Sequence, residues 1–533
     1  MDSLSQARAL LPFWLPFVSL LALPFGFGAG FLLARSLTPF AYRRVLAAGG
    51  DHWTERARLA WPARKWTGLA ALAIPAVLGA LGARLGGPLS LLGPAAAGLL
   101  GGAAALAGFA LGMWPVARRL HGPSIGGPAR FLASSVSLLL VRAPHVVVAA
   151  AFAAFMPPRF SGHSGEAAAL LAIGTILMFA AAFGGGLAVG RLLGLVRPAD
   201  ERLLRAVAAA ASHAGVAPPA AAVLACHLPV AFAIPLRRVL VFSDSALALL
   251  DEAEREAVAA HETGHLTESR SVTFQRVVGL FFFTLLVAAP TLAGEGGRAA
   301  FLAVLFSLLA LVAVGAFSRR TSREMEARAD AHAAAHAKGS VYARALEKMH
   351  EAALAPAVLG TRNATHPDLW DRMAAAGSPP AWPKPGRPAS GLAGRLALGF
   401  VCALVFVAAE TGRPGAVGAL SRRNPLAAVA LTGGEPWPLS ELAGARAAEG
   451  RSEEAVVLYR AAFTLDGSPR HLANAAFVAS RSGRCDAAKV LADEALRASR
   501  LPGVSSWDRY LAGRAVDVAR RCGTANPDED DDD

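Results

Sequence analysis

The sequence predicts a mainly α-helical protein with several membrane-spanning helices, one segment that carries a metal-binding helix, and helical repeats in the C-terminal part. Three observations support this fold class. Of the 533 residues, 54% are hydrophobic and 17% are charged, whereas about a quarter of the residues are charged in ordinary soluble domains. A His-Glu-x-x-His pattern stands at 261–265. Small and apolar residues also recur at a fixed spacing between 439 and 500.

The composition limits the class of protein. It excludes a disordered or fibrous chain and argues against a purely soluble one. The 52 Lys and Arg against 39 Asp and Glu give a net charge of +13. This surplus lies beside apolar runs, as in the loops of a membrane protein, so we expect no nucleic-acid partner. Few Lys among many Ala and Gly indicate a GC-rich, bacterial source. The four Cys are too scattered for a Cys-based metal site, so His and carboxylates must hold any metal.

Eight stretches are long and apolar enough to cross a bilayer, which takes about 20 mainly apolar residues. The stretch at 131–156 is interrupted by Arg142, Pro144 and His145. A Pro-kinked helix explains it best, with a re-entrant segment or a poor span as alternatives. The eight stretches are approximately 10–34, 66–82, 88–114, 131–156, 167–190, 274–293, 299–317 and 391–410.

Arg and Lys residues predict the orientation, because they collect in cytoplasmic loops. They gather in the 35–65 and 115–130 loops. Counting on along the chain, 191–273 and 318–390 should also be cytoplasmic, and the region after 410 should lie outside. The first apolar run is too long for a signal peptide and should stay as an anchor. We therefore expect a multi-pass integral protein of the bacterial inner membrane, with the lipid bilayer as a partner.

The pattern at 261–265 predicts a catalytic zinc site. On a helix, His261 and His265 share one face and can bind a single Zn²⁺, with Glu262 beside the open coordination position. Zinc lowers the pKa of water to about 7 and polarises a carbonyl, and Glu262 would act as general base. Such a pattern arises by chance in roughly one chain of this kind in a hundred. Gly264 between the two ligands costs a helix about 1 kcal/mol and indicates close packing.

A second charged segment can supply the third protein ligand that a hydrolytic zinc site needs. Glu326 and Asp330 are four residues apart and face one way. We expect Glu326 to bind the metal and Asp330 to hold a ligand imidazole in its metal-binding tautomer. A charged helix leaving the membrane is the alternative explanation. His332 and His336 also have metal-ligand spacing, but an exposed, Ala-rich helix explains them better.

These residues resemble the integral-membrane zinc endopeptidases of the HtpX type and the type-I CAAX prenyl proteases. The resemblance covers about 200–375 and rests on three motifs in the family's order. They are E-x-x-A-V-x-A-H-E-x-x-H from Glu254 to His265, S-R-x-x-E-x-x-A-D from Ser322 to Asp330, and T-H-P-x-x-x-x-R-(I/M) from Thr365 to Met373. The family also places two apolar helices between the first two motifs, and 274–317 supplies them.

The resemblance implies a zincin-type metallopeptidase domain with one Zn²⁺ per chain. It implies that Glu262 is the general base and that His366 and Arg372 lie near the substrate or the oxyanion. The ligands that it implies are His261, His265 and Glu326.

The resemblance also implies a small edge β element that binds substrate. Residues 230–233 and 238–242 look like the family's N-A-F-A and the strand that follows it, although Val230 stands where the family usually has Asn. An extended strand can pair with the backbone of a substrate. Phe232 and Ala233 are therefore expected to bind substrate.

The C-terminal part resembles tetratricopeptide repeats, whose period is 34 residues. Gly450, Ala455 and Leu458 recur 33 positions later as Gly483, Ala488 and Leu491. Stacked helix pairs of this kind can bind a protein partner, and a helical bundle without a partner is the alternative. Cys485 and Cys522 could pair if this region lies outside the cytoplasm.

The expected organisation has five parts. These are an N-terminal transmembrane region of about five spans at 1–197, a metallopeptidase domain with a membrane hairpin (about 274–317) at 198–375, a Pro/Gly-rich linker and last span at 376–411, TPR-like repeats at 412–522, and an acidic disordered tail at 523–533.

The function expected from the sequence is zinc-dependent endoproteolysis at the cytoplasmic membrane face. Its substrates would be proteins or peptides, in membrane protein quality control or regulated proteolysis. The alternative is a catalytically silent membrane sensor or scaffold that binds partners through the peptidase-like domain and the repeats. A transporter is disfavoured, because ionisable residues inside the predicted spans are scarce apart from Arg142 and His145.

Overall fold

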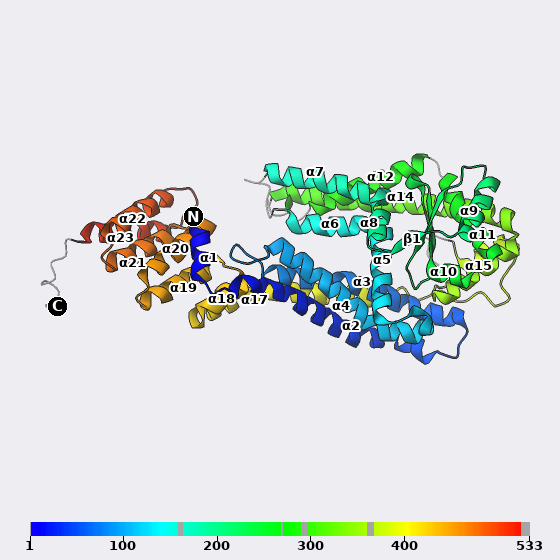
Figure 1. Ribbon diagram of the computed structural model, residues 1–533, viewed down its shortest axis with the longest axis horizontal. Coiled ribbons are helices and arrows are strands. Elements are labelled where there is room, and N and C mark those ends of the chain that lie inside the picture. The colour runs from blue at the N-terminus through cyan, green and yellow to red at the C-terminus, as the bar shows by residue number, and fades with distance from the viewer. Residues whose placement is uncertain are drawn as a thin grey trace. The chain divides into compact units, whose positions relative to one another are not determined.

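The structure is a computed structural model that describes residues 2–157, 164–267, 270–288, 291–292, 297–359 and 367–523. The described chain is mainly α-helical (Figure 1). It divides into two compact units. Unit 1 comprises Met1–Gly28, Ile74–Ala105 and Phe400–Asp533, and unit 2 comprises Ala29–Ala73 and Leu106–Gly399.

Six helical stretches among the described residues are long and apolar enough to cross a membrane. They belong to α2 (Ala22–Ala47), α3 (Trp53–Ala83), α4 (Pro94–His121), α7 (Ser164–Ala180) with α8 (Gly186–Leu192), α14 (Gly297–Ala337) and α17 (Leu392–Arg423). The predicted span at 274–293 falls on α12 (Arg270–Val287) and on residues outside the described part, and α12 is not one of the six.

The interrupted stretch at 131–156 forms two helices and not one kinked helix. α5 (Pro128–Arg142) and α6 (Pro144–Phe155) are bent by 86° at the break, and together they count as a seventh possible span. Ala143 between them has φ −132° and ψ 42°, because a residue that precedes proline is forced out of the helical region. Pro144 is then free to start a new helix.

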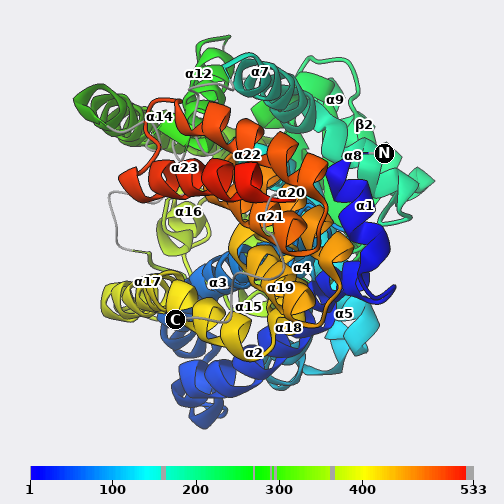
Figure 2. The same cartoon turned by 90° about the vertical axis from the view of Figure 1, so that its left-hand side faces the viewer.

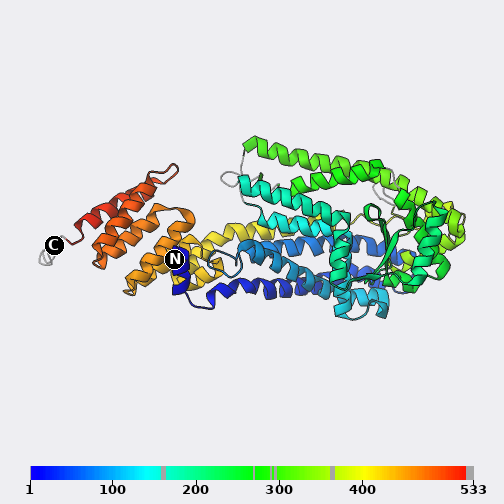
Figure 3. The same ribbon diagram turned by 45° about the horizontal axis from the view of Figure 1, so that its top comes forward.

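α14 extends well beyond the span predicted at 299–317. The predicted span at 299–317 and the charged segment at 322–336 form one continuous helix of 41 residues. Figures 1 and 3 show α12 and α14 side by side. One long helix therefore joins the apolar hairpin to Glu326 and Asp330.

Unit 2 contains a four-stranded sheet, which is larger than the expected edge element. Its order is β1-β2-β4-β3, with β2 and β4 parallel and the other neighbours antiparallel. β3 is an edge strand and pairs on one side with β4, so that Phe232 lies opposite Val241. The strands are β1 (Val196–Pro198), β2 (Ala220–Leu224), β3 (Ala231–Ile234) and β4 (Val239–Ser243).

The two faces of this sheet are covered by different helices. Val223, Leu240 and Phe242 belong to a core shared with α9 (Glu201–His213), α11 (Glu252–Gly264) and α15 (Gly339–Ala352). Val239 and Val241 belong to a core on the other face, shared with Val141 of α5 and Leu187 of α8. Because neighbouring strand residues point to opposite faces, Phe232 faces α5 while Ala233 faces the core of α11.

Capping and an ion pair fix the start of α11. Asp251 and Glu254 form a capping box, in which each side chain accepts a hydrogen bond from the other residue's backbone N–H. The fully buried carboxylate of Glu254 lies 2.7 Å from the Lys348 ammonium of α15. These contacts fix the first turn of α11 against α15.

Unit 1 contains the C-terminal helices, which Figures 2 and 3 show as a stack. Gly450 and Gly483 have φ values of 77° and 75° in the turns after α19 and α21, a region that glycine adopts readily. Ala455 and Ala488 follow these turns and are fully buried. The stack comprises α18 (Pro425–Thr432), α19 (Pro436–Ala448), α20 (Ser452–Asp466), α21 (Pro469–Arg481), α22 (Cys485–Ser499) and α23 (Ser506–Arg521), and α1 (Ser3–Leu10) packs on α20.

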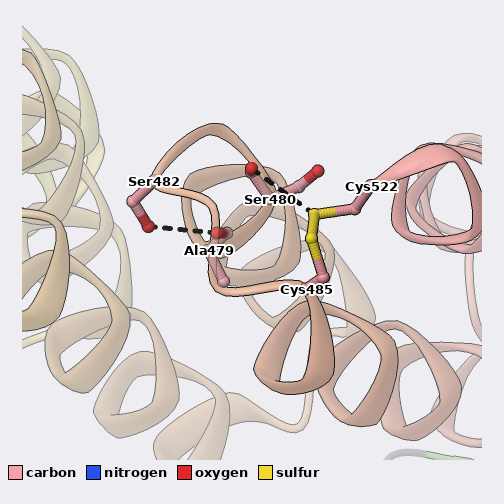
Figure 4. The surroundings of a disulfide bond; sticks show 5 residues. All are labelled: Ala479, Ser480, Ser482, Cys485 and Cys522. Carbon is pink, nitrogen blue, oxygen red and sulfur yellow. Dashed lines mark hydrogen bonds between the residues drawn. A yellow bond between two sulfur atoms is a disulfide. The ribbon is translucent and has the colours of Figure 1, made fainter. Parts of the chain in front are cut away.

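A disulfide joins Cys485 at the start of α22 to Cys522 after α23 (Figure 4). Cys226 is buried and free, and Cys402 is also free. The four cysteines are thus divided equally between a disulfide and thiols.

This division predicts the number of reactive thiols. Protein that is denatured without reductant should take up two maleimide labels, at Cys226 and Cys402, and reduction should raise the number to four. Mass spectrometry of the intact chain measures both numbers. Labelling of all four cysteines without reductant would contradict the disulfide.

Candidate metal centre and active site

Three side chains from two helices converge on one point. His261 lies in the last turn of α11, His265 follows this helix directly as its C-cap residue, and Glu326 comes from α14. The two imidazole Nε2 atoms are 3.3 Å apart. Glu326 Oε2 lies 3.5 Å from His261 Nε2, and Glu326 Oε1 lies 3.5 Å from His265 Nε2.

These donors fit zinc. Imidazole nitrogen and carboxylate oxygen are typical zinc ligands, with bonds of about 2.0–2.2 Å, and tetrahedral geometry then separates the donor atoms by about 3.3–3.5 Å. The separations observed among the three donors are 3.3, 3.5 and 3.5 Å. His261, His265 and Glu326 therefore suit a tetrahedral ion with one open position.

The close approach of α11 and α14 depends on Gly264. A Cβ atom at this position would lie 3.0 Å from the Cα atom and 3.2 Å from the Cβ atom of Ala329. The close packing indicated by the sequence is confirmed, and it brings the two ligand-bearing helices within reach of one ion.

A hydrogen-bond network contacts the Nδ1 side of the His261 ring, opposite the Nε2 atom that faces the candidate metal position. Asp330 Oδ1 lies 3.0 Å and the Tyr342 hydroxyl oxygen 2.8 Å from His261 Nδ1. The Tyr342 hydroxyl donates to Asp330 Oδ1 over 2.6 Å. With acceptors beside Nδ1, the proton of a neutral His261 belongs on Nδ1, which leaves Nε2 available to a metal.

Arg372 completes this network. Its guanidinium donates two hydrogen bonds to the Asp330 carboxylate, over 2.8 and 2.7 Å, and a third to the Tyr342 oxygen over 3.0 Å. Arg372 is buried and lies behind His261 on Asp330, and it is not among the residues that line the cavity described below. His366 lies outside the described residues.

Burial and charge also set the protonation of the network. Burial lowers the pKa of His261, but hydrogen bonds to Asp330 and Glu326 outweigh it and raise the pKa to about 9. Burial raises the pKa of Tyr342 well above its usual value. The hydroxyl group therefore stays protonated and can donate its hydrogen bond to Asp330.

Tyr342 is the residue that sequence reasoning missed. It belongs to no motif, and the alternation of apolar and polar residues along 339–352 indicates only that it is buried. Its role depends on α15 folding against α11 and α14, which brings Tyr342 to a histidine 81 positions away.

A cavity of about 730 Å³ opens onto the candidate metal centre. Its size is typical of ligand pockets. Glu262, the expected base, lines it together with His261, His265 and Glu326. Phe232 and Ala233 of the edge strand line the same cavity, with residues of the α5/α6 break and of the bulge between α7 and α8 at 181–185.

His332 and His336 correct another expectation. They were predicted on an exposed helix, yet both are partly buried, with rings 5.4 and 4.7 Å from the ring of His213. His336 Nε2 lies 2.7 Å from Glu256 Oε1. Within the described part of the chain they do not join a group of three potential ligands, and the group at Glu326 remains the candidate metal centre.

We predict that Tyr342→Phe weakens zinc binding roughly tenfold while the protein stays folded, because losing a hydrogen bond that orients a ligand typically costs 10- to 100-fold in affinity. Competition with a chromophoric chelator measures the affinity. Tyr510→Phe is the matched control, since Tyr510 is exposed on α23. Equal affinity in Tyr342→Phe and wild type would show that Tyr342 does not orient His261.

One comparison with known proteins identifies the segment that contains this site. Residues 198–379 match the family model described as Peptidase family M48. No curated protein matches the chain. The crystal structure of Ste24p from S. mikatae matches at 13% identity and a TM-score of 0.40, over 68% of this chain and 99% of that one, a similarity too low to support a conclusion by itself. The family match confirms the resemblance seen in the sequence, and residues 198–379 are a domain of peptidase family M48.

Proposed function

We propose that this protein is a membrane-embedded, zinc-dependent endopeptidase that hydrolyses peptide bonds of proteins or peptides at the cytoplasmic membrane face. The observation that carries the proposal is the triangle of His261, His265 and Glu326 donors, 3.3–3.5 Å apart, in a cavity that Glu262 also lines. A membrane protein with an M48 domain could act in quality control or in regulated proteolysis.

The proposed reaction is attack of water on a peptide carbonyl. His261, His265 and Glu326 would hold one zinc ion, which acts as a Lewis acid and favours deprotonation of water near neutral pH. Glu262 takes a proton from the water as its oxygen bonds to the carbonyl carbon. Glu262 then gives that proton to the amine nitrogen as the C–N bond breaks.

Asp330, Tyr342 and Arg372 act in this proposal through His261. Asp330 accepts a hydrogen bond from the Nδ1–H group of His261, and Arg372 and Tyr342 donate hydrogen bonds to the Asp330 carboxylate. The proposed role of Arg372 is therefore positioning, in place of the contact with substrate or oxyanion that the family resemblance implied. His366 keeps a proposed role near the oxyanion from that resemblance alone.

Substrate binding is assigned to β3. Among the described strands its outer edge has no partner, and Phe232 and Ala233 line the cavity. An extended peptide can add to such an edge through main-chain hydrogen bonds, which depend little on sequence. A broad choice of unfolded segments is expected, with preferences set by nearby side chains.

We further propose that the metal centre is cytoplasmic and that the C-terminal helices lie outside. Contacts within unit 1 support this arrangement: Arg8 donates to the Pro88 carbonyl over 3.1 Å, and the Leu89 N–H donates to the Gly433 carbonyl over 3.1 Å. The α3–α4 connection and the segment after α17 would then lie on one side, so an even number of crossings must separate them.

With the α5/α6 pair counted as one crossing, this parity favours a crossing by α12 as well. Between the α3–α4 connection and Gly433, the possible spans are α4, the α5/α6 pair, α7 with α8, α14 and α17, which is an odd number. α12 would supply the sixth crossing. The disulfide between Cys485 and Cys522 supports an external C-terminal region, because disulfides persist in oxidising compartments and are rare in the cytosol.

The C-terminal helices α19–α23 are proposed to be TPR-like and to bind a protein partner. Equivalent turns at Gly450 and Gly483, each followed by a buried alanine, support a repeat. The alternative of a silent sensor or scaffold is not favoured, because the three candidate ligands and the candidate base Glu262 are all present.

The topology predicts opposite results for two fusions. Alkaline phosphatase fused after residue 523 should be active, because it folds only outside the cytoplasm, and green fluorescent protein inserted at residue 50 should be fluorescent. Both are measured in cells at matched expression. A phosphatase that is inactive after 523 but active at 50 would reverse the proposed orientation.

The mechanism predicts that Glu262→Gln binds zinc like wild type but loses about a hundredfold to ten-thousandfold of its activity, the usual contribution of a general base. Glu326→Ala should lose both zinc and activity. The measurement is cleavage of unfolded, dephosphorylated casein by detergent-purified protein, with zinc content determined in parallel. Chelation should abolish wild-type cleavage, and added zinc should restore it.

Glu324→Ala is the matched control, since Glu324 is an exposed carboxylate two residues from Glu326. It should retain zinc and activity. Undiminished cleavage by Glu262→Gln would exclude the assigned base. Absence of cleavage by zinc-loaded wild type would favour the silent scaffold.

A further inference from the structure

Arg142 is a cation at a break in an otherwise apolar segment. It is the last residue of α5, directly before the 86° bend to α6. No carboxylate among the described residues pairs with Arg142, and its guanidinium lies over the ring of Phe232. An ionisable side chain in a membrane segment is costly and typically marks a functional site.

The Arg142 side chain lines the cavity of the candidate metal centre. His145, at the start of α6, lines it as well, as does Phe183 in the bulge between α7 and α8. Gly184 in that bulge has φ 101°, and Arg237 donates to the Phe183 carbonyl over 2.8 Å. Irregular backbone at membrane depth occurs where it is buried in protein or lines a water-filled space, so the two breaks support an aqueous cavity.

Polar contacts fix α5 against the peptidase domain. The Ser137 hydroxyl donates to the Ala225 carbonyl over 2.5 Å. The Ser134 hydroxyl lies 2.6 Å from His227 Nδ1, and Arg130 lies 3.2 Å from the Asp244 carboxylate. These contacts lie on the helix that ends at Arg142, so the helix presents Arg142 at a defined place.

Close packing from α8 fixes the other end of α5. A Cβ atom on Gly186 would lie 2.1 Å from the Leu140 carbonyl oxygen, so only glycine allows this contact. Leu140 is two residues before Arg142. The guanidinium is therefore carried on a rigid part of the wall and not on a loose loop.

Phe232 connects Arg142 to the proposed substrate strand. The guanidinium carbon of Arg142 lies 5.9 Å from the ring centre of Phe232, within cation–π range. Phe232 faces α5, whereas Ala233 faces the core of α11. A peptide added to the outer edge of β3 would alternate its side chains in the same way. Its groups on the Phe232 side would meet Arg142.

We propose that Arg142 forms a subsite for a carboxylate of the peptide substrate and so determines specificity. This inference rests on the proposed peptidase function and deepens it. A guanidinium presents paired N–H donors that match a carboxylate. The carboxylate belongs either to an Asp or Glu side chain or to the C-terminus of the substrate. A lipid phosphate is disfavoured, because Arg142 lies over the strand assigned to peptide binding.

Peptide mapping tests the subsite. Full-length, zinc-loaded protein in detergent is given a library of unstructured synthetic peptides with free C-termini, and the same library amidated, and cleavage sites are found by mass spectrometry. If Arg142 binds a substrate side chain, the peptides that wild type cleaves should be enriched in Asp or Glu at one fixed position relative to the scissile bond. If the C-terminus binds, cleavage should occur at a fixed distance from it and be lost on amidation.

Paired peptides then quantify the contact. Replacing the recognised carboxylate by its amide should lower kcat/KM of wild type at least tenfold, mainly through KM. In Arg142→Gln the acid and the amide should be cleaved equally. Arg142→Lys should keep part of the preference, and Arg142→Glu should prefer Lys or Arg at that position. Arg191→Gln is the matched control, since Arg191 is an exposed arginine on α8 outside the cavity, and it should behave like wild type.

The outcomes separate this inference from the proposed function. Wild-type cleavage without any carboxylate preference, or a preference that persists in Arg142→Gln, would overturn the subsite and leave the peptidase intact. Retention of anionic lipid by purified wild type but not by Arg142→Gln, without a peptide preference, would assign the site to lipid and also overturn it.

If wild type cleaves none of the peptides, a peptide-binding measurement still tests the subsite. Fluorescence anisotropy with labelled peptides and the Glu262→Gln protein compares acid and amide forms directly. Tighter binding of the acid that is lost in the Glu262→Gln, Arg142→Gln double variant would support the subsite without catalysis. Equal binding of both forms would exclude it.

Discussion

The close contact between α11 and α14 is the constraint on which the rest of the site depends. Gly264 lets the backbones approach at Ala329, and this fixes which turn of α14 faces His261 and His265. Glu326 and Asp330 are one turn apart on that face, so one presents an oxygen to the metal position and the other to His261 Nδ1. A shift of one turn, about 5.4 Å, would remove both contacts together.

Behind His261, the negative charge of Asp330 is compensated by the positive charge of Arg372. Asp330 and Arg372 are joined by two hydrogen bonds and share Tyr342. A buried ion pair contributes little net stability, but removing one partner leaves an uncompensated charge at a large cost. The arrangement therefore favours a single orientation of His261, which is what a metal ligand needs.

The sheet joins the peptidase domain to the N-terminal helices. One face is shared with α9, α11 and α15, and the other with α5 and α8. β3 lies at the edge, and it lines the same cavity as α5 from one set of helices and α11 from the other. The helices α5 and α6 and the bulge after α7 are thus part of the wall around the candidate site.

The sequence by itself determined the features that depend on local spacing. The four-residue intervals from His261 to His265 and from Glu326 to Asp330 place each pair on one face of a helix, whatever surrounds it. Apolar length likewise predicted six of the eight spans as long helices, and Gly264 indicated close packing. The order of three motifs predicted the family of the 198–379 domain.

Only the tertiary structure decided the features that join distant segments. Tyr342 reaches His261, and Arg372 binds Asp330, because α15 and α16 (Leu369–Ala375) fold against α11 and α14. The sheet order, the partial burial of His332 and the place of Arg142 beside Phe232 follow from the same long-range packing. Local periodicity contains no information on which segments meet, since that choice depends on the burial and hydrogen bonding of the whole chain.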